Sequence, residues 1–235
     1  GPIDILARRT NRDENLPRLD AWDGIGRNLE QVVFHPDYHE IGRLVWGAGV
    51  LSRYRTPGHE TATLALTYLL AQNGEAGHCC PLACGAGMIK ILQAAGGHDE
   101  RVRRLTEPRY EDAWRASQFL TEVQGGSDVG ANAVVARSGA SGWTLHGEKW
   151  FCSVVDADLF LVTARPEGAP PGTGGLRAFV VPRLHAGHPN GFRIRRLKYK
   201  LGTRSMASAE VDFDGAVAEP VGDFRRTVEV VLNTS

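Results

Sequence analysis

The segment from Gln118 to Asp128 holds the residue types of this 235-residue chain that are best suited to bind a ligand. Thr121 and Glu122 end a predicted strand, and the pair Gly125-Gly126 follows. Glycines allow close approach to the backbone, consecutive N–H groups can face ring oxygens or phosphates, and hydroxyls give directed hydrogen bonds. The segment suits a flat, anionic ligand. On spacing alone, a plain turn between strands, capped by Ser127 and Asp128, is the more common arrangement.

A run of cations is the second feature that could bind a ligand. Six basic residues lie within twelve positions with no acidic residue among them: Arg193, Arg195, Arg196, Lys198, Lys200 and Arg204. They could form a solvated strand face, contact ligand phosphates, or contact DNA. Their alternation with Phe192 and Ile194 favours the strand face, and the equal numbers of basic and acidic residues, 27 each, disfavour DNA.

Three of the four cysteines, Cys79, Cys80 and Cys84, follow His78 closely. The cluster lacks the paired spacing of a zinc site, so we predict no metal and interpret the residues as small side chains buried on a helix. Metal or redox use is the less favoured alternative. The cysteine content, with no signal peptide or membrane-spanning apolar run, favours a reducing compartment, and we expect the cytoplasm.

The positions before residue 115 show helical periodicity. Apolar stripes over Ile41–Leu51 and Leu64–Ala71 predict two helices, with starts near Pro36 and Glu60. A third helix carries Met88, Ile91 and Leu92 on one face and stops at Gly96-Gly97.

After residue 115 the period becomes two. Trp143–Phe151 predicts two strands joined by a turn at Gly147, while 159–164 and 178–181 predict buried neighbours. Further strands are expected over 192–201, with a bulge at Arg196, and over 209–213. We therefore expect a small antiparallel β-barrel.

These patterns divide the chain into three parts, an α+β multidomain arrangement. Residues 1–114 are expected to form an N-terminal helical domain, 115–220 a middle β-barrel, and 221–235 the start of a further helix. That last pattern stops without a C-cap, so we expect a truncated C-terminal domain.

Three motifs in order resemble the acyl-CoA dehydrogenase family. Thr121, Glu122, Gly126, Ser127 and Asp128 match T-E-x-x-x-G-S-D, Gly147–Ser153 is similar to G-x-K-x-x-I-(T/S), and Lys200–Ser205 is similar to K-x-G-x-R-x-S. The resemblance covers about residues 30–235. The AidB-like branch is the most similar, through Val33–Pro36, Gln124–Val129 and Lys149–Phe151.

This resemblance implies an N-terminal helical domain, a β-barrel that binds FAD, and a C-terminal four-helix bundle, which is missing here. It assigns FAD contacts to Gln118, Phe119, Leu120, Thr121, Ser127, Phe151, Cys152 and Ser153. Residues 118–121 would act through the backbone and the Thr121 hydroxyl, Phe151 would pack on the ring, Cys152 would act through its backbone, and Ser153 would bond near N5 or the ribityl arm. Ser127 would also face the pantetheine of an acyl-CoA. Trp150 could equally be barrel core.

The implied reaction is α,β-dehydrogenation of an acyl thioester, with hydride transfer to flavin N5. No residue of this chain matches the catalytic base: Glu122 and Asp128 are expected to be structural, and Glu229 comes too early in the first helix after the barrel. The base is expected beyond Ser235, in a missing region or a partner subunit, and the complete protein to be a homo-oligomer, dimer or tetramer. Alternatives are an AidB-like regulatory or DNA-associated flavoprotein, and a flavin-dependent oxidase on the same scaffold.

Overall fold

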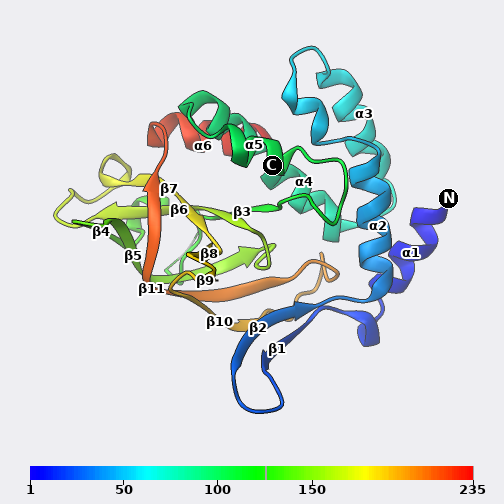
Figure 1. The fold of residues 1–235 in the computed structure, drawn as a ribbon, viewed down its shortest axis with the longest axis horizontal. Coiled ribbons are helices and arrows are strands. Elements are labelled where there is room, and N and C mark those ends of the chain that lie inside the picture. The colour runs from blue at the N-terminus through cyan, green and yellow to red at the C-terminus, as the bar shows by residue number, and fades with distance from the viewer. Residues whose placement is uncertain (125, 235) are drawn as a thin grey trace.

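A closed ring of strands forms the centre of the fold (Figure 1). The structure is a computed structural model that describes residues 1–124 and 126–234, so Gly125 and Ser235 lie outside the described residues. In the ring, β11 pairs with β5, β5 with β4, β4 with β6, β6 with β7, and β7 with β11. The ring strands are β4 (Val135–Gly139), β5 (Gly142–Ser153), β6 (Leu159–Pro166), β7 (Arg177–Pro182) and β11 (Ser208–Pro220). The predicted small barrel is confirmed.

The barrel is not purely antiparallel, as the sequence suggested. Strand β3 (Ala116–Phe119) pairs in parallel with Leu159–Val162 of β6, and β4 pairs in parallel with Arg165 and Pro166 of the same strand. Parallel neighbours require a crossover connection rather than a hairpin. Here β4 and β5 together form the connection between β3 and β6, which places the end of β3 at the edge of the barrel (Figure 1).

Gly147 lies inside one long strand, which corrects the prediction of two strands around a turn. β5 continues through Gly147, which pairs with Phe213 of β11. Its φ of 126° is unfavourable for other residues, and a Cβ there would lie 3.1 Å from the Val134 Cα. The glycine therefore lets the strand pass close to Val134 without ending it.

The bulge predicted in the basic run is confirmed, but the strand is shorter than expected. β10 (Phe192–Leu197) pairs with β11, and the register shifts between Ile194 and Arg196. The chain then leaves the sheet, and Tyr199 and Leu201 are exposed. Residues 198–207 form a connection instead of the expected second strand, because no partner strand is paired with them in the described structure.

Six α-helices are described: α1 (Pro2–Thr10), α2 (Pro36–Gly47), α3 (Glu60–Ala71), α4 (Ala76–Ala95), α5 (Asp99–Leu105) and α6 (Phe224–Thr234). The predicted starts of α2 and α3 are confirmed, as is the stop of α4 at Gly96, where φ is 74°. The structure corrects the stripe on α3: Leu64 and Tyr68 are exposed, and α3 buries Thr63 and Leu70. None of the described helices is long and apolar enough to cross a membrane.

The region before residue 115 is not entirely helical. Strands β1 (Arg18–Trp22) and β2 (Asn28–Val33) form a hairpin that projects from the lower edge of the molecule in Figure 1. A second small hairpin pairs β8 (Leu184–His185) with β9 (His188–Pro189). Neither was expected from the sequence. The division into three domains stays a prediction.

Two hydrophobic cores meet at β6. Inside the barrel, Phe119 stacks on Phe160 with ring centroids 4.8 Å apart. On the other face of the same strand, Leu159 and Leu161 pack in the core that contains Met88 of α4. The first six residues of β6 are all buried, so the prediction of a strand covered on both faces is confirmed.

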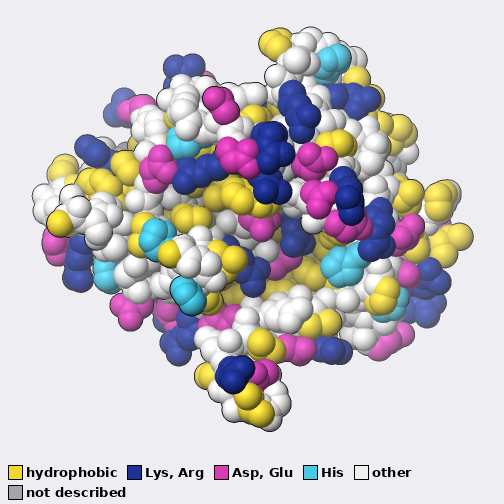
Figure 2. Space-filling view, viewed as in Figure 1, with side chains coloured by type: hydrophobic (Ala, Val, Ile, Leu, Met, Phe, Trp, Pro, Cys, Tyr) yellow, Lys and Arg dark blue, Asp and Glu magenta, His cyan; other side chains and the backbone are white. Residues whose placement is uncertain are grey.

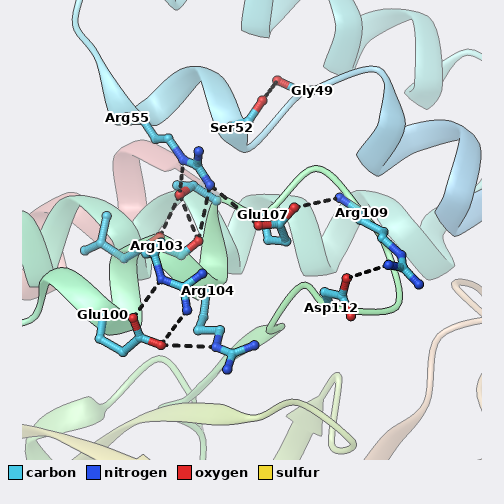
Figure 3. Close-up of polar contacts among 11 residues, drawn as sticks. Gly49, Ser52, Arg55, Glu100, Arg103, Arg104, Glu107, Arg109 and Asp112 are labelled. Carbon is cyan, nitrogen blue, oxygen red and sulfur yellow. Dashed lines mark hydrogen bonds and ion pairs between the residues drawn. The ribbon is translucent and has the colours of Figure 1, made fainter.

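The connection from α5 to β3 is fixed by polar contacts (Figure 3). Arg55 donates to the Thr106 hydroxyl at 2.8 Å and to the Arg103 carbonyl at 3.4 Å. Arg103 in turn pairs with Glu100 one turn earlier. These contacts tie the end of α5 to the short 3₁₀ helix at Ser52–Arg55, and the chain enters β3 from this anchored position.

Candidate functional site

A buried ion pair lies beneath the segment that follows β3. The Lys149 Nζ is 2.7 Å from the Glu122 Oε1, and both side chains are almost completely buried. Lys149 also donates to the Leu120 carbonyl at 3.1 Å and to the Thr163 hydroxyl at 3.0 Å. Burial lowers the pKa of Lys149 to about 8, while the Glu122 carboxylate opposes that shift.

The Glu122 carboxylate is fully occupied by donors. Its oxygens accept from the Ala133 and Val134 backbone N–H groups and from the Gln124 side chain, in addition to Lys149. A carboxylate held in this way is not free to remove a proton from a substrate. The geometry therefore agrees with a structural role for Glu122.

This network brings together the two predicted ligand-contact segments. The Trp150 N–H donates to the Thr121 carbonyl at 2.9 Å, and Asn132 holds the Leu120 carbonyl at 3.0 Å. The ends of β3 and β5 consequently form one surface at the rim of the barrel. Beside them, the Gln118 Nε2 is buried without a hydrogen-bond partner among the described residues.

The predicted contact residues differ in what they can present to a ligand. The side chains of Phe119 and Cys152 are completely buried, so only their backbones can be used, and burial raises the pKa of the Cys152 thiol. Phe151 is 48% exposed. Among the other predicted contacts, Ser127 is exposed, and four are partly exposed: Gln118, Leu120, Thr121 and Ser153.

Lys198 and Ser208, at the two ends of the 198–207 connection, complete this surface. The sequence offered Lys198 only as one of several possible ligand contacts and did not single out Ser208. The Lys198 Nζ lies 3.6 Å from the centroid of the Trp150 ring and 4.5 Å from that of Phe151. The Ser208 hydroxyl is 3.1 Å from the Ser153 hydroxyl. The alternation of Lys198 with apolar neighbours was the available signal, but it does not reveal which strand the lysine faces.

Acids on neighbouring strands neutralise most of the basic run. Asp212 pairs with Arg193 at 3.1 Å, and Glu210 pairs with Lys198 at 2.9 Å. The further pairs are Arg195 with Glu148 and Asp212, Arg196 with Glu210, and Arg204 with Asp13. On the face shown in Figure 2, basic and acidic side chains are likewise interspersed. Arg193, Arg195 and Arg196 thus form an ion-paired face of β10, as the favoured interpretation held, whereas Lys198, Lys200 and Arg204 lie in the connection after that strand.

The cysteine cluster lies on α4, as expected. Cys84 is buried, Cys79 and Cys80 are partly buried, and all four cysteines are free. Within residues 1–124 and 126–234, no group of three or more His, Cys, Asp or Glu side chains could hold a metal ion.

Two family models match successive parts of the chain. Residues 3–112 match the adaptive response protein AidB N-terminal domain, and residues 117–216 match the acyl-CoA dehydrogenase middle domain.

Curated relatives agree with these matches. Acyl-CoA dehydrogenase family member 11 of Caenorhabditis elegans is 32% identical over 98% of this chain and 40% of its own length. The putative acyl-CoA dehydrogenase AidB of Escherichia coli is 34% identical over 93% of this chain and 42% of its own length. The chain thus spans about two fifths of the length of these relatives.

Solved structures share the fold. The apo form of Bd2924 superposes with a TM-score of 0.89 at 27% identity, over 99% of this chain and 48% of that one. The Caenorhabditis elegans ACDH-11 complex with C11-CoA gives a TM-score of 0.83 at 31% identity, over 99% and 42%.

Proposed function

The chain belongs to the acyl-CoA dehydrogenase family, and we propose that it forms the N-terminal and middle parts of an FAD-dependent oxidoreductase of the AidB-like branch. The observation that carries this proposal is the shared surface at the ends of β3 and β5. There, backbone groups, an orphaned amide donor on Gln118, an exposed Phe151 ring and the Ser153 hydroxyl lie around one rim of the barrel.

The residues present fit a flavin. The unpaired Gln118 Nε2 needs an acceptor, which the oxygens and nitrogens of an isoalloxazine can supply. The backbone of residues 118–121, together with the Thr121 hydroxyl, would hold the pyrimidine side. Phe151 would pack against the flat ring, Cys152 would contribute its backbone, and Ser153 would bond near N5 or the ribityl arm. Bound FAD supplies the acceptor for a hydride.

The substrate we propose is an acyl-CoA thioester. The ACDH-11 relative has been solved with C11-CoA, and it is 31% identical to this chain. Ser127, exposed beside the site, would contact the pantetheine arm. The chain's own contribution is to bind, orient and exclude water from one side of the reacting groups.

The catalytic base is proposed to lie outside residues 1–235, in a part of the relatives that this chain does not span or in a partner subunit. Glu122 is committed to Lys149 and two backbone N–H groups. Glu229 is exposed on α6 and is not proposed as the base.

A second candidate function is an AidB-like regulatory flavoprotein with little dehydrogenase activity. The match of residues 3–112 to the AidB N-terminal domain favours it. Contact with DNA through the basic run is not favoured, since its arginines pair with acids.

Anaerobic reduction of the flavin tests the primary proposal. The longer protein that contains this chain, loaded with FAD, is mixed with acyl-CoA thioesters of graded chain length, and visible absorbance is recorded. We expect bleaching by at least one thioester. If no thioester bleaches the flavin, the regulatory alternative replaces the dehydrogenase proposal.

A variant of the ring contact tests the assignment of the surface. In the longer protein, Phe151→Ala is expected to raise the Kd for FAD at least tenfold, a loss of about 1.4 kcal/mol or more. Trp22→Ala, which removes an exposed aromatic ring from the β1–β2 hairpin, is the matched control and should retain FAD. An equal Kd in both variants would place the flavin elsewhere.

Location and assembly are proposals on separate grounds. Four free cysteines suit a reducing compartment, and we propose the cytoplasm. We also propose a homo-oligomer, dimer or tetramer, for the longer protein. Light scattering of that protein during gel filtration would measure its mass, and a monomer would refute this part.

A further inference from the structure

Two cysteines face each other on α4, beside the candidate flavin surface. The Cys80 and Cys84 sulfurs are 3.9 Å apart, one helical turn from each other. Cys84 is buried, while Cys80 is partly exposed. Cys80 can therefore meet a small reagent from solvent, and Cys84 lies within reach of whatever forms on its sulfur.

The surroundings distinguish Cys80 from the other thiols. The hydrogen bond with Cys84, together with the positive charge of Lys200, lowers the pKa of Cys80. Burial instead raises the pKa of Cys79, to about 11, and that of Cys152. Because the thiolate is the nucleophile, Cys80 is the thiol that reacts first.

One backbone hydrogen bond of the helix is missing at the turn that carries the pair. Pro81 has no N–H, so the bond that would normally reach the Gly77 carbonyl cannot form. The Tyr38 hydroxyl donates to that carbonyl instead, at 3.1 Å. A disulfide needs Cβ atoms about 3.5–4.5 Å apart, and residues one turn apart have them about 5–6 Å apart. The turn must tighten, and one missing backbone bond lowers the resistance to that movement.

We propose that Cys80 and Cys84 form a peroxide-sensitive dithiol that closes to a disulfide within α4. The Cys80 thiolate attacks one peroxide oxygen, the O–O bond breaks, and the departing hydroxide takes the proton released by the thiol to give water. The sulfenic acid on Cys80 is then attacked by the Cys84 sulfur. The S–S bond forms, the S–O bond breaks, and the leaving oxygen takes the Cys84 proton as a second water. Peroxide is reduced, and the two thiols are oxidised by two electrons.

This pair is connected to the proposed flavin contacts. Lys200, which acts electrostatically on Cys80, donates to the Ser208 hydroxyl at 2.9 Å. Ser208 is in turn 3.1 Å from Ser153. When the disulfide closes, the negative charge of the Cys80 thiolate near Lys200 is lost. Lys200 is linked to Ser153 through two hydrogen bonds, by way of Ser208.

Thiol counting after peroxide treatment tests the proposal. The reduced 235-residue chain is treated with equimolar hydrogen peroxide, unfolded, alkylated and digested with trypsin, which yields Thr56–Lys90 as one peptide. We expect this peptide to lose two hydrogens and to carry one alkyl group, on Cys79. Four alkylated cysteines after treatment, or a bridge to Cys79, would overturn the proposal.

Single substitutions provide the controls. Cys79→Ser should still lose two thiols to oxidation, whereas Cys80→Ser should keep Cys84 reduced. Cys84→Ser should stop at a Cys80 sulfenic acid, which a 1,3-diketone traps. Fragmentation of the wild-type peptide locates the bridge without any variant, so a variant that fails to fold leaves the test intact. A trapped sulfenic acid on Cys79 instead of Cys80 would contradict the assignment.

Discussion

At the scale of single residues, the buried pair Glu122–Lys149 is held by several contacts. The Lys149 ammonium is surrounded by one carboxylate, one carbonyl and one hydroxyl, all within 3.1 Å. Burying two charges is costly, and the pair persists because each charge is satisfied by several partners. Its structural effect is to hold the end of β3 beside β5, where the proposed flavin contacts lie.

Removing one charge of this pair should be strongly destabilising. We predict that Lys149→Met lowers the free energy of unfolding by about 3–5 kcal/mol, because Glu122 is left buried and uncompensated. Urea unfolding followed by circular dichroism measures the change. Arg137→Met, which breaks the exposed pair with Glu167, is the control and should cost less than about 1 kcal/mol. A similar small cost for both variants would mean that Lys149 is not charged in the folded state.

The sequence identified the chemistry-bearing segment but not this arrangement. Thr121 and Phe151 could be selected because their motifs have fixed order and spacing. Lys198 and Ser208 could not, because their place depends on how the 198–207 connection folds over β5. Local spacing carries no information about that long-range contact.

At the scale of elements, α2, α4 and the segment before β3 meet in an aromatic cluster. The His78 ring stacks on Tyr38 with centroids 4.2 Å apart and meets Trp46 edge-on at 5.7 Å. Its Nε2 lies 2.7 Å from the Tyr38 carbonyl. Burial lowers the pKa of His78 to about 4, so the ring is neutral in the folded protein at neutral pH.

Acid should therefore weaken this interface. Between pH 6.5 and 4 the unfolded chain binds a proton at His78 that the folded chain does not, so stability falls as the pH falls through that window. We predict that the wild-type protein loses about 2 kcal/mol more than His78→Phe between pH 7 and 5, at about 1.4 kcal/mol per pKa unit. Urea unfolding at both pH values measures this.

The same experiment needs a control for other acid-sensitive groups. Burial raises the pKa of Glu75 nearby, but Glu75 is present in both proteins and its contribution cancels. His188→Phe changes an exposed histidine on β9 and should behave as wild type. Equal acid losses in wild type and His78→Phe would show that His78 is protonated in the folded state.

Two glycines of α2 give opposite expectations. A Cβ at Gly42 would overlap the Tyr110 ring, whereas a Cβ at Gly47 meets nothing within 4 Å. We predict that Gly42→Ala lowers the melting temperature by the equivalent of about 1–3 kcal/mol, through overpacking. Gly47→Ala should raise it slightly, because alanine favours the helix by up to about 1 kcal/mol. Scanning calorimetry compares them, and stabilisation by both substitutions would contradict the packing of Tyr110 on α2.

Elements were predictable where local periodicity and burial coincide. The strand at Leu159–Ala164 and the start of α2 at Pro36 follow from apolar content and capping residues. The β1–β2 hairpin was missed because only Glu30 and Val32 of β2, and no residue of β1, are buried. On α3, the apolar stripe at Leu64 and Tyr68 faces outward, so periodicity alone gave the helix but the wrong buried face.

At the scale of the whole molecule, the described chain forms one wall of the proposed flavin site. Phe151 is 48% exposed, Val123 is 52% exposed, and Leu201 is fully exposed. These apolar side chains are exposed beside polar groups that are unpaired or belong to the backbone. Such a surface is one that a ligand or another chain segment covers. Ligand sites usually bury about 70–90% of the ligand surface, which a single wall does not achieve.

The 235-residue chain alone should consequently hold FAD poorly. We predict that it purifies with well under one FAD per chain, because the residues that contact the ring cannot enclose it, while the longer protein that contains the chain purifies yellow. Visible absorbance after precipitation of the protein measures the released flavin. Thermal melts with and without added FAD give a second measurement, since a ligand that binds only the folded state raises its melting temperature. A near-stoichiometric yellow preparation of the short chain would contradict the one-wall description, and it would require the surface around Phe151 to close over the flavin by itself.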